Sequence, residues 1–126
     1  MTPQIIAHRC SGTCYPDNSY DAAVALLKSA LYGIDIDIHM TLDEAAIIQH
    51  NSTSSTGQEI RYTTYSDLPS STPKLADVLL VARKYPDKMI NIELKSIPIR
   101  QDSSFNKRFA KRVVAMVEEY GLADQI

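Results

Sequence analysis

The chain has 126 residues, 22% of them charged and 44% hydrophobic, which is the composition of an ordinary globular protein of one domain. Its net charge of -2 gives no basic stripe of the kind that binds nucleic acid through phosphate attraction. The longest apolar run is far below the ~20 residues of a membrane-spanning helix. The N-terminus has no secretory signal, so we expect a cytoplasmic protein.

The first half of the chain predicts two strands flanking one helix, and then a third strand. Residues 4–8 form a buried β-rich run, and residues 19–31 have helical periodicity with Asn18 as the expected N-cap. Residues 33–40 alternate strictly between apolar and polar, which is the period of a strand. A further strand is expected over residues 45–50, and the spacing leaves its direction relative to the preceding strand open.

The second half begins with a long polar stretch. Residues 51–72 are rich in serine and threonine and predict a loop, and long loops in compact domains are usually functional or disordered. Pro73 suits the first position of a helix that has Ser71 or Thr72 as its cap and ends before Pro86.

The last elements are a strand over residues 89–96 and a helix over residues 104–120 with Ser104 as its cap. Four strands alternating with three helices predict an α/β fold with a mostly parallel sheet. Active sites in such folds lie at the carboxyl ends of the strands.

Cys10 and Cys14 lie close together in the sequence. A disulfide across three residues can form, but two cysteines in a chain without a secretory signal are more often free thiols. We therefore expect free thiols.

Acidic residues gather near the ends of two predicted strands. Asp35 and Asp37 share one face of their strand, with Cβ atoms ~6–7 Å apart, so both carboxylates could reach one ion. Glu93 on another strand could supply a third oxygen, and carboxylate ligands suit Mg²⁺ or Ca²⁺. The alternative is a charged network in which Arg9 and Lys95 neutralise the same acids.

Two histidines stand at other strand ends. His8 and His50 are candidates for a general acid and a general base, because the ordinary histidine pKa lies in the neutral range. His39 is interpreted as a supporting or structural residue. Arg9 and Lys95 could then bind a multiply charged oxyanion, most simply a phosphate.

Six segments, taken in order, resemble motifs of the glycerophosphodiester phosphodiesterase family. They are IIAHR at 5–9, YPDNS at 15–19, GIDIDIHMTLD at 33–43, IIQHN at 47–51, TPKLADVL at 72–79 and NIELK at 91–95. The resemblance runs from residue 4 to about residue 126. It implies a TIM barrel that cleaves glycerophosphodiesters to glycerol 3-phosphate and an alcohol, usually with a bound divalent cation, in glycerol and lipid metabolism.

By this resemblance, the matching positions take the family's roles. His8 and His50 are the acid–base pair, Arg9 and Lys95 contact the phosphate, and the metal ligands are Asp35, Asp37 and Glu93. The sequence also departs from the family pattern at several positions. Asp35 and Asp17 stand where the family has Glu, Asn51 where it has Asp, and Cys10 and Glu44 where it has or prefers Gly.

Residues 1–126 would supply about the first four βα units of a (β/α)₈ barrel, which typically has ~250 residues. Open sheet edges are expected at residues 4–8 and 89–96, so a second copy in a homodimer or a missing C-terminal half would complete the barrel. One alternative is a truncated, non-catalytic fragment that retains the metal and phosphate motif. Another is a relative of phospholipase D-type toxins, which the lack of a secretory signal disfavours.

Overall fold

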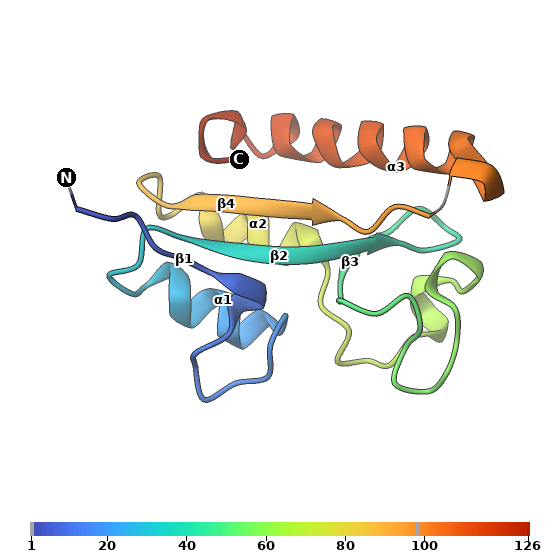
Figure 1. The fold of residues 1–126 in the computed structure, drawn as a ribbon, viewed down its shortest axis with the longest axis horizontal. Helices are drawn as coiled ribbons and strands as arrows, with labels where there is room; N and C mark the ends of the chain where they lie inside the picture. The colour runs from blue at the N-terminus through green and yellow to red at the C-terminus, as the bar shows by residue number, and fades with distance from the viewer. Residues whose placement is uncertain (1, 98) are drawn as a thin grey trace.

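Four strands and three α-helices make up the part of the chain that the structure describes, residues 2–97 and 99–126 of a computed structural model (Figure 1). In chain order they are β1 (Ile6–Ala7), α1 (Tyr20–Leu27), β2 (Gly33–Met40), β3 (Ala46–Ile48), α2 (Leu75–Ala82), β4 (Met89–Leu94) and α3 (Ile99–Glu119). Short 3₁₀ turns lie at η1 (His8–Cys10), η2 (Ile60–Tyr62), η3 (Tyr65–Asp67) and η4 (Ala123–Gln125). Each predicted strand and helix is present, and all but the strand at residues 33–40 have shifted ends.

The sheet is centred on β2, which pairs with the other three strands. β4 runs parallel to β2 along one edge, with Asp37 opposite Glu93. β1 is parallel and β3 is antiparallel, and both pair with the other edge of β2, at opposite ends. The mostly parallel α/β sheet is therefore confirmed. The four expected βα units are not all present as parallel units, because the short turn after Met40 sends β3 back along β2.

Gly33 allows β2 and β4 to approach closely. A Cβ atom built on Gly33 would lie 2.1 Å from the backbone oxygen of Met89, closer than real atoms come. Only glycine fits this register, in which Gly33 is paired with Met89. The first residue of β2 thus fixes how β4 lies beside it.

The apolar face of β2 forms the centre of the core. Ile34, Ile36 and Ile38 are fully buried, and the cluster around them contains side chains from α1, α2 and α3. Burying a side chain of this size contributes about 1.5–3 kcal/mol. In Figure 1, α3 lies along one side of the sheet and α2 lies behind it. The opposite face of β2 carries the aspartates, which leaves the polar face for the site.

The predicted caps of two helices were wrong. Ser19, not Asn18, caps α1, because its Oγ accepts a hydrogen bond from Ala22 N at 3.2 Å. In α3 the backbone of Asp102 is extended, and Asp102 Oδ1 accepts hydrogen bonds from Phe105 N and Ser104 Oγ. Asp102 therefore caps the long helical segment that follows, in place of Ser104.

The polar stretch 51–72 is a loop, as predicted, and it contains η2 and η3. Ile60 and Leu68 from this loop pack against Ile47 of β3 in a small apolar cluster. The predicted start of α2 was wrong, because Pro73 precedes the helix and Lys74 is the N-cap position. The carbonyl of Pro73 accepts a hydrogen bond from Ile48 N at 2.9 Å. Pairing with β3 keeps Lys74 extended.

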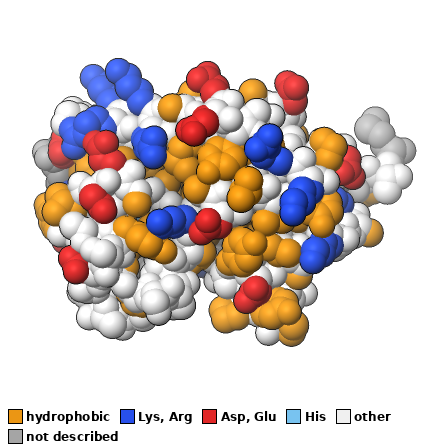
Figure 2. Space-filling view, turned by 180° about the vertical axis from the view of Figure 1, so that it is seen from behind, with side chains coloured by type: hydrophobic (Ala, Val, Ile, Leu, Met, Phe, Trp, Pro, Cys, Tyr) orange, Lys and Arg blue, Asp and Glu red, His pale blue; other side chains and the backbone are white. Residues whose placement is uncertain are grey.

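Both cysteines are free, as predicted, with Cys10 buried and Cys14 exposed. The face turned away from the viewer in Figure 1 mixes acidic, basic and apolar side chains, and no large basic patch gathers on it (Figure 2). Among the described residues, no helix has the length and apolar character needed to cross a membrane.

Candidate active site

The turn that follows β1 presents His8 and Arg9 at the carboxyl edge of the sheet. Arg9 and Cys10 have φ values of 52° and 53°, so two successive non-glycine residues adopt the left-handed conformation. Such backbone strain is frequent at functional sites. The Cys10 thiol donates to the Asp35 carbonyl at 3.6 Å, and burial, reinforced by nearby aspartates, raises its pKa to about 12. Cys10 therefore supports the turn as a neutral thiol.

His8 is oriented by Asp35. The distance from His8 Nδ1 to Asp35 Oδ2 is 2.8 Å, which fits an Nδ1–H donor and leaves Nε2 on the exposed side of the ring. The same carboxylate oxygen accepts from Arg9 N at 3.2 Å. The other oxygen, Oδ1, accepts from Asn91 Nδ2 at 2.5 Å. Both oxygens of Asp35 are thus committed to protein donors.

Asp37 is fully buried at the centre of the cluster. Asn18 Nδ2 donates to Asp37 Oδ2 at 2.9 Å, and Asp37 N donates back to Asn18 Oδ1 at 3.2 Å. Lys95 Nζ lies 3.1 Å from Oδ1 and Arg9 Nε lies 3.5 Å from Oδ2. Burial alone would raise the pKa of Asp37, but the hydrogen bonds and the charge of Lys95 outweigh burial and lower it. Asp37 is therefore a carboxylate at neutral pH.

Lys95 forms ion pairs with acidic residues of two neighbouring strands, β2 and β4. Its Nζ donates to Glu93 Oε1 at 2.5 Å while it pairs with Asp37. Burial would lower the pKa of Lys95, but these two carboxylates outweigh burial and raise it. Lys95 is a permanent positive charge beside the carboxylates.

His50 joins the site through Arg9. Arg9 Nη2 is 2.6 Å from His50 Nε2, and His50 Nδ1 is 3.0 Å from Asn51 Oδ1. Since a guanidinium can only donate, Nε2 is the acceptor in this arrangement and Nδ1 carries the hydrogen. His39 Nε2 donates to the His50 carbonyl at 3.2 Å, and burial lowers the pKa of His39. This contact fits the supporting role expected of His39.

The structure brings together every residue that the sequence analysis assigned to the site. The contacts join His8 to Asp35, Asp37 to Arg9 and Lys95, Lys95 to Glu93, and Arg9 to His50. A groove of about 500 Å³ opens beside Arg9 and His50.

Two asparagines in the site were missed. Asn18 was predicted only as a helix cap, and Asn91 was given no role beyond opening the segment NIELK. Their spacing along the chain gives no signal for bonds to Asp37 and Asp35. Only the register of Asp35 opposite Asn91 on neighbouring strands could have suggested one of them.

The acids form the charged network that was one of the two open alternatives, with Arg9 and Lys95 as counter-charges. Within the described residues, no three histidine, cysteine, aspartate or glutamate side chains are grouped around a common point. Asp37 Oδ1 is nevertheless buried without an aligned hydrogen bond, and Glu93 is its neighbour across the sheet. Two carboxylates of this kind suit Mg²⁺, which commonly binds one or two carboxylates together with substrate phosphate.

No family model matches the sequence, and no curated protein matches it. Solved structures do. A glycerophosphodiester phosphodiesterase from Parabacteroides distasonis is 26% identical, with a TM-score of 0.82 over 97% of this chain and 53% of that one. An Oleispira antarctica phosphodiesterase in complex with the product sn-glycerol-3-phosphate is 20% identical, with a TM-score of 0.79 over 94% and 53%.

A third similar structure is the glycerophosphodiester phosphodiesterase of Thermotoga maritima, which is 20% identical, with a TM-score of 0.73 over 94% of this chain and 51% of that one. The chain thus spans about half the length of the structures it matches. Nearly all of this chain resembles about half of a glycerophosphodiester phosphodiesterase.

Proposed function

We propose that the chain carries the acid–base and phosphate-binding groups of a phosphodiesterase that hydrolyses glycerophosphodiesters to glycerol 3-phosphate and an alcohol. The observation that carries this proposal is one connected cluster of two histidines and two cations around two aspartates. Arg9 and Lys95 pair with the buried Asp37, His8 pairs with Asp35, and His50 contacts Arg9. The similarity to the Parabacteroides enzyme supports the substrate class.

Arg9 and Lys95 bind the phosphate in this proposal. A phosphodiester is an anion, and guanidinium and ammonium groups form charge-assisted hydrogen bonds to its oxygens. Arg9 now contacts His50 Nε2, so a phosphate that attracts the guanidinium would free this nitrogen. Substrate binding and exposure of a basic nitrogen are thereby coupled.

The hydrogen bonds support different roles for the two histidines. His50 Nε2, unprotonated beside Arg9, is the base that removes a proton from the attacking water. His8, whose Nδ1–H is held by Asp35, delivers a proton from Nε2 to the leaving alcohol oxygen as the bond from phosphorus to that oxygen breaks. Asp35 stabilises the imidazolium form of His8 and fixes its orientation, as carboxylates do for histidine in other hydrolases.

A divalent cation, Mg²⁺ or Ca²⁺, would be held by Asp37 and Glu93, with Lys95 turning from them to the phosphate. When bound, the ion neutralises charge on the phosphate. Asp35, the third ligand predicted from the sequence, has both oxygens committed to His8, Arg9 and Asn91, and we assign it to His8 instead.

The test is hydrolysis of glycerophosphocholine and glycerophosphoinositol by the purified chain, followed through release of glycerol 3-phosphate. His8→Ala and His50→Ala should each lower kcat by about 10²–10⁴-fold, the usual contribution of general acid–base catalysis. EDTA should abolish activity and Mg²⁺ or Ca²⁺ restore it. Arg83→Gln, at an exposed position after α2, is the control and should behave as the wild type.

Full turnover in excess chelator would refute the cation. A near-wild-type rate in either histidine variant, with an unchanged circular dichroism spectrum, would refute the role of that histidine. Binding of glycerol 3-phosphate without hydrolysis of any diester would favour the alternative of a non-catalytic phosphate-binding fragment.

A further inference from the structure

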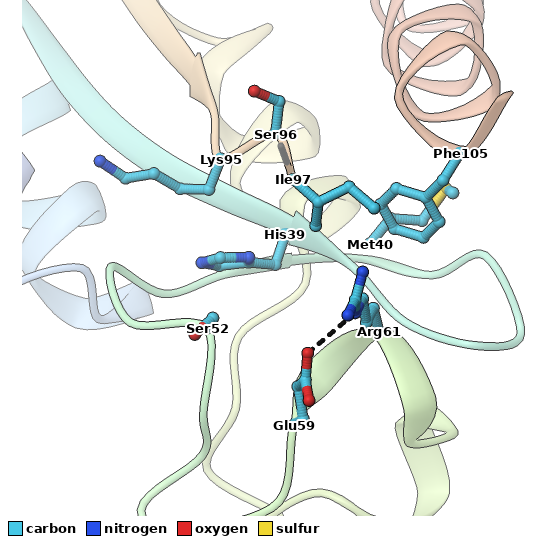
Figure 3. Close-up of a pocket in the computed structure, with 9 residues that line it drawn as sticks. All are labelled: His39, Met40, Ser52, Glu59, Arg61, Lys95, Ser96, Ile97 and Phe105. Carbon is cyan, nitrogen blue, oxygen red and sulfur yellow. Dashed lines mark hydrogen bonds and ion pairs between the residues drawn. The ribbon is translucent and has the colours of Figure 1, made fainter. Parts of the chain in front are cut away.

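A cavity of about 260 Å³ opens at the carboxyl ends of β2 and β4 (Figure 3). Its apolar wall consists of Met40 at the end of β2, Ile97 after β4 and Phe105 of α3. Arg61 from the loop 51–72 contributes a positive charge, and Lys95 lines the cavity while its ammonium points away from Arg61 in Figure 3. The long loop therefore also builds one side of a cavity.

The cavity adjoins the candidate active site through Lys95. This side chain lines the cavity, and its Nζ pairs with Asp37 and Glu93. A phosphate bound at Lys95 would therefore lie next to the cavity, within reach of one of its ester groups. The groove beside Arg9 and His50 remains for the other group.

Arg61 is held in place by its neighbours. Its Nε donates to Glu59 Oε1 at 2.8 Å, and its guanidinium carbon lies 4.4 Å from the centre of the Tyr62 ring. The side chain is only 18% exposed. In Figure 3 the guanidinium points from the loop toward the cavity. Within the described residues no hydrogen bond occupies its Nη groups, so Arg61 offers preorganised donors.

We propose that this cavity binds the alcohol portion of the phosphodiester and selects alcohols rich in hydroxyl groups over cationic ones. This inference rests on the proposed function. Hydroxyl oxygens can accept hydrogen bonds from Arg61, and the apolar wall can cover a carbon skeleton. A quaternary ammonium would face the guanidinium of Arg61 and could donate no hydrogen bond, and the one acid in the lining, Glu59, is already paired with Arg61.

The first test compares glycerophosphoinositol with glycerophosphocholine as substrates of the full chain. The wild type should show a kcat/KM about tenfold or more higher for the inositol diester, the size expected for a hydrogen bond to a charged group. Arg61→Gln should remove this preference by raising KM for the inositol diester while kcat is kept. Arg83→Gln, at the far end of α2, should retain the preference. An unchanged preference in folded Arg61→Gln would overturn the inference.

The second test measures binding by NMR, without turnover. Glycerophosphoinositol should shift the Arg61 Nε–H signal and the backbone amides of Ile97 and Phe105, and glycerophosphocholine at the same concentration should shift them far less. These shifts without hydrolysis of either diester would refute the proposed function and support the cavity as a binding site. No shift at the cavity, or equal shifts with both diesters, would overturn the inference even if both diesters are hydrolysed.

Discussion

Removing the side chain of Asn18 tests whether amide groups stabilise the buried carboxylate. The φ of Asn18 is 55°, which glycine adopts without strain, so Asn18→Gly isolates the loss of the amide. Two hydrogen bonds disappear, one from Asn18 Nδ2 to Asp37 Oδ2 at 2.9 Å and one from Asp37 N to Asn18 Oδ1 at 3.2 Å.

The expected loss follows from these two bonds. A hydrogen bond to a charged group contributes about 1.5–3 kcal/mol and a neutral one about 0.5–1.5 kcal/mol, so the free energy of unfolding should fall by about 3 kcal/mol. Asp37 is fully buried, so water cannot easily replace the amide. Asn18→Ala should lose about 1 kcal/mol more, because alanine is strained at positive φ. Urea unfolding at pH 7, followed by circular dichroism, measures both values.

The pH dependence gives a sharper check. The pKa of Asp37 is lower in the folded chain, where the bonds from Asn18 and Lys95 outweigh burial, than its unfolded value of about 3.9. Such a group stabilises the fold above its unfolded pKa, and the contribution is lost as pH falls through the folded pKa. Asn18→Gly removes one of these bonds and brings the pKa of Asp37 in the folded chain closer to its unfolded value. The difference in stability between wild type and variant should therefore shrink below about pH 4. An equal difference at pH 3 and pH 7 would refute the link to the Asp37 charge.

Three further outcomes are expected. Glu44→Gly should raise the free energy of unfolding by about 1 kcal/mol, because Glu44 has a φ of 62°, which glycine adopts without strain. Little is lost with the side chain, because its ion pair with Arg108 is half exposed. Glu44→Ala should give no gain, because alanine is strained at the same φ. Gly33→Ala should cost about 1–3 kcal/mol and speed hydrogen exchange in β4, because its Cβ would meet the Met89 oxygen; unchanged exchange would contradict the close approach. The chain should self-associate through the outer edge of β4, which pairs with no strand among the described residues. Sedimentation velocity would disprove this association by showing a monomer at all concentrations.

Local pattern was sufficient to predict the elements and where the charged residues gather. The alternation of residues 33–40 predicted the bounds of β2. The expected carboxyl ends of β2 and of its neighbouring strands indicated where His8, Asp37 and Lys95 gather. Periodicity reports which face a side chain lies on, so these predictions needed no knowledge of partners. The direction of β3 was left open, although a connection as short as residues 41–45 joins neighbouring strands only in an antiparallel pair.

Contacts between distant segments could not be predicted in the same way. Asn18 is separated from Asp37 by a helix and its turn, and its role depends on a left-handed backbone conformation that sequence spacing does not report. The helix caps failed for a related reason. Several polar residues stand before each helix, and tertiary contacts decide which one is free to cap it.

The departures from the family pattern at Cys10 and Asp35 occur in one place in the fold. The Cys10 thiol donates to the backbone oxygen of Asp35, and the Asp35 carboxylate accepts from His8 and from Arg9 N within the same turn. A glutamate at position 35 would extend one methylene further into the site and would be less suited to hold this turn. The shorter side chain therefore favours a carboxylate that orients His8, while Asp37 and Glu93 remain together beside Lys95 as the pair from which a cation could be bound.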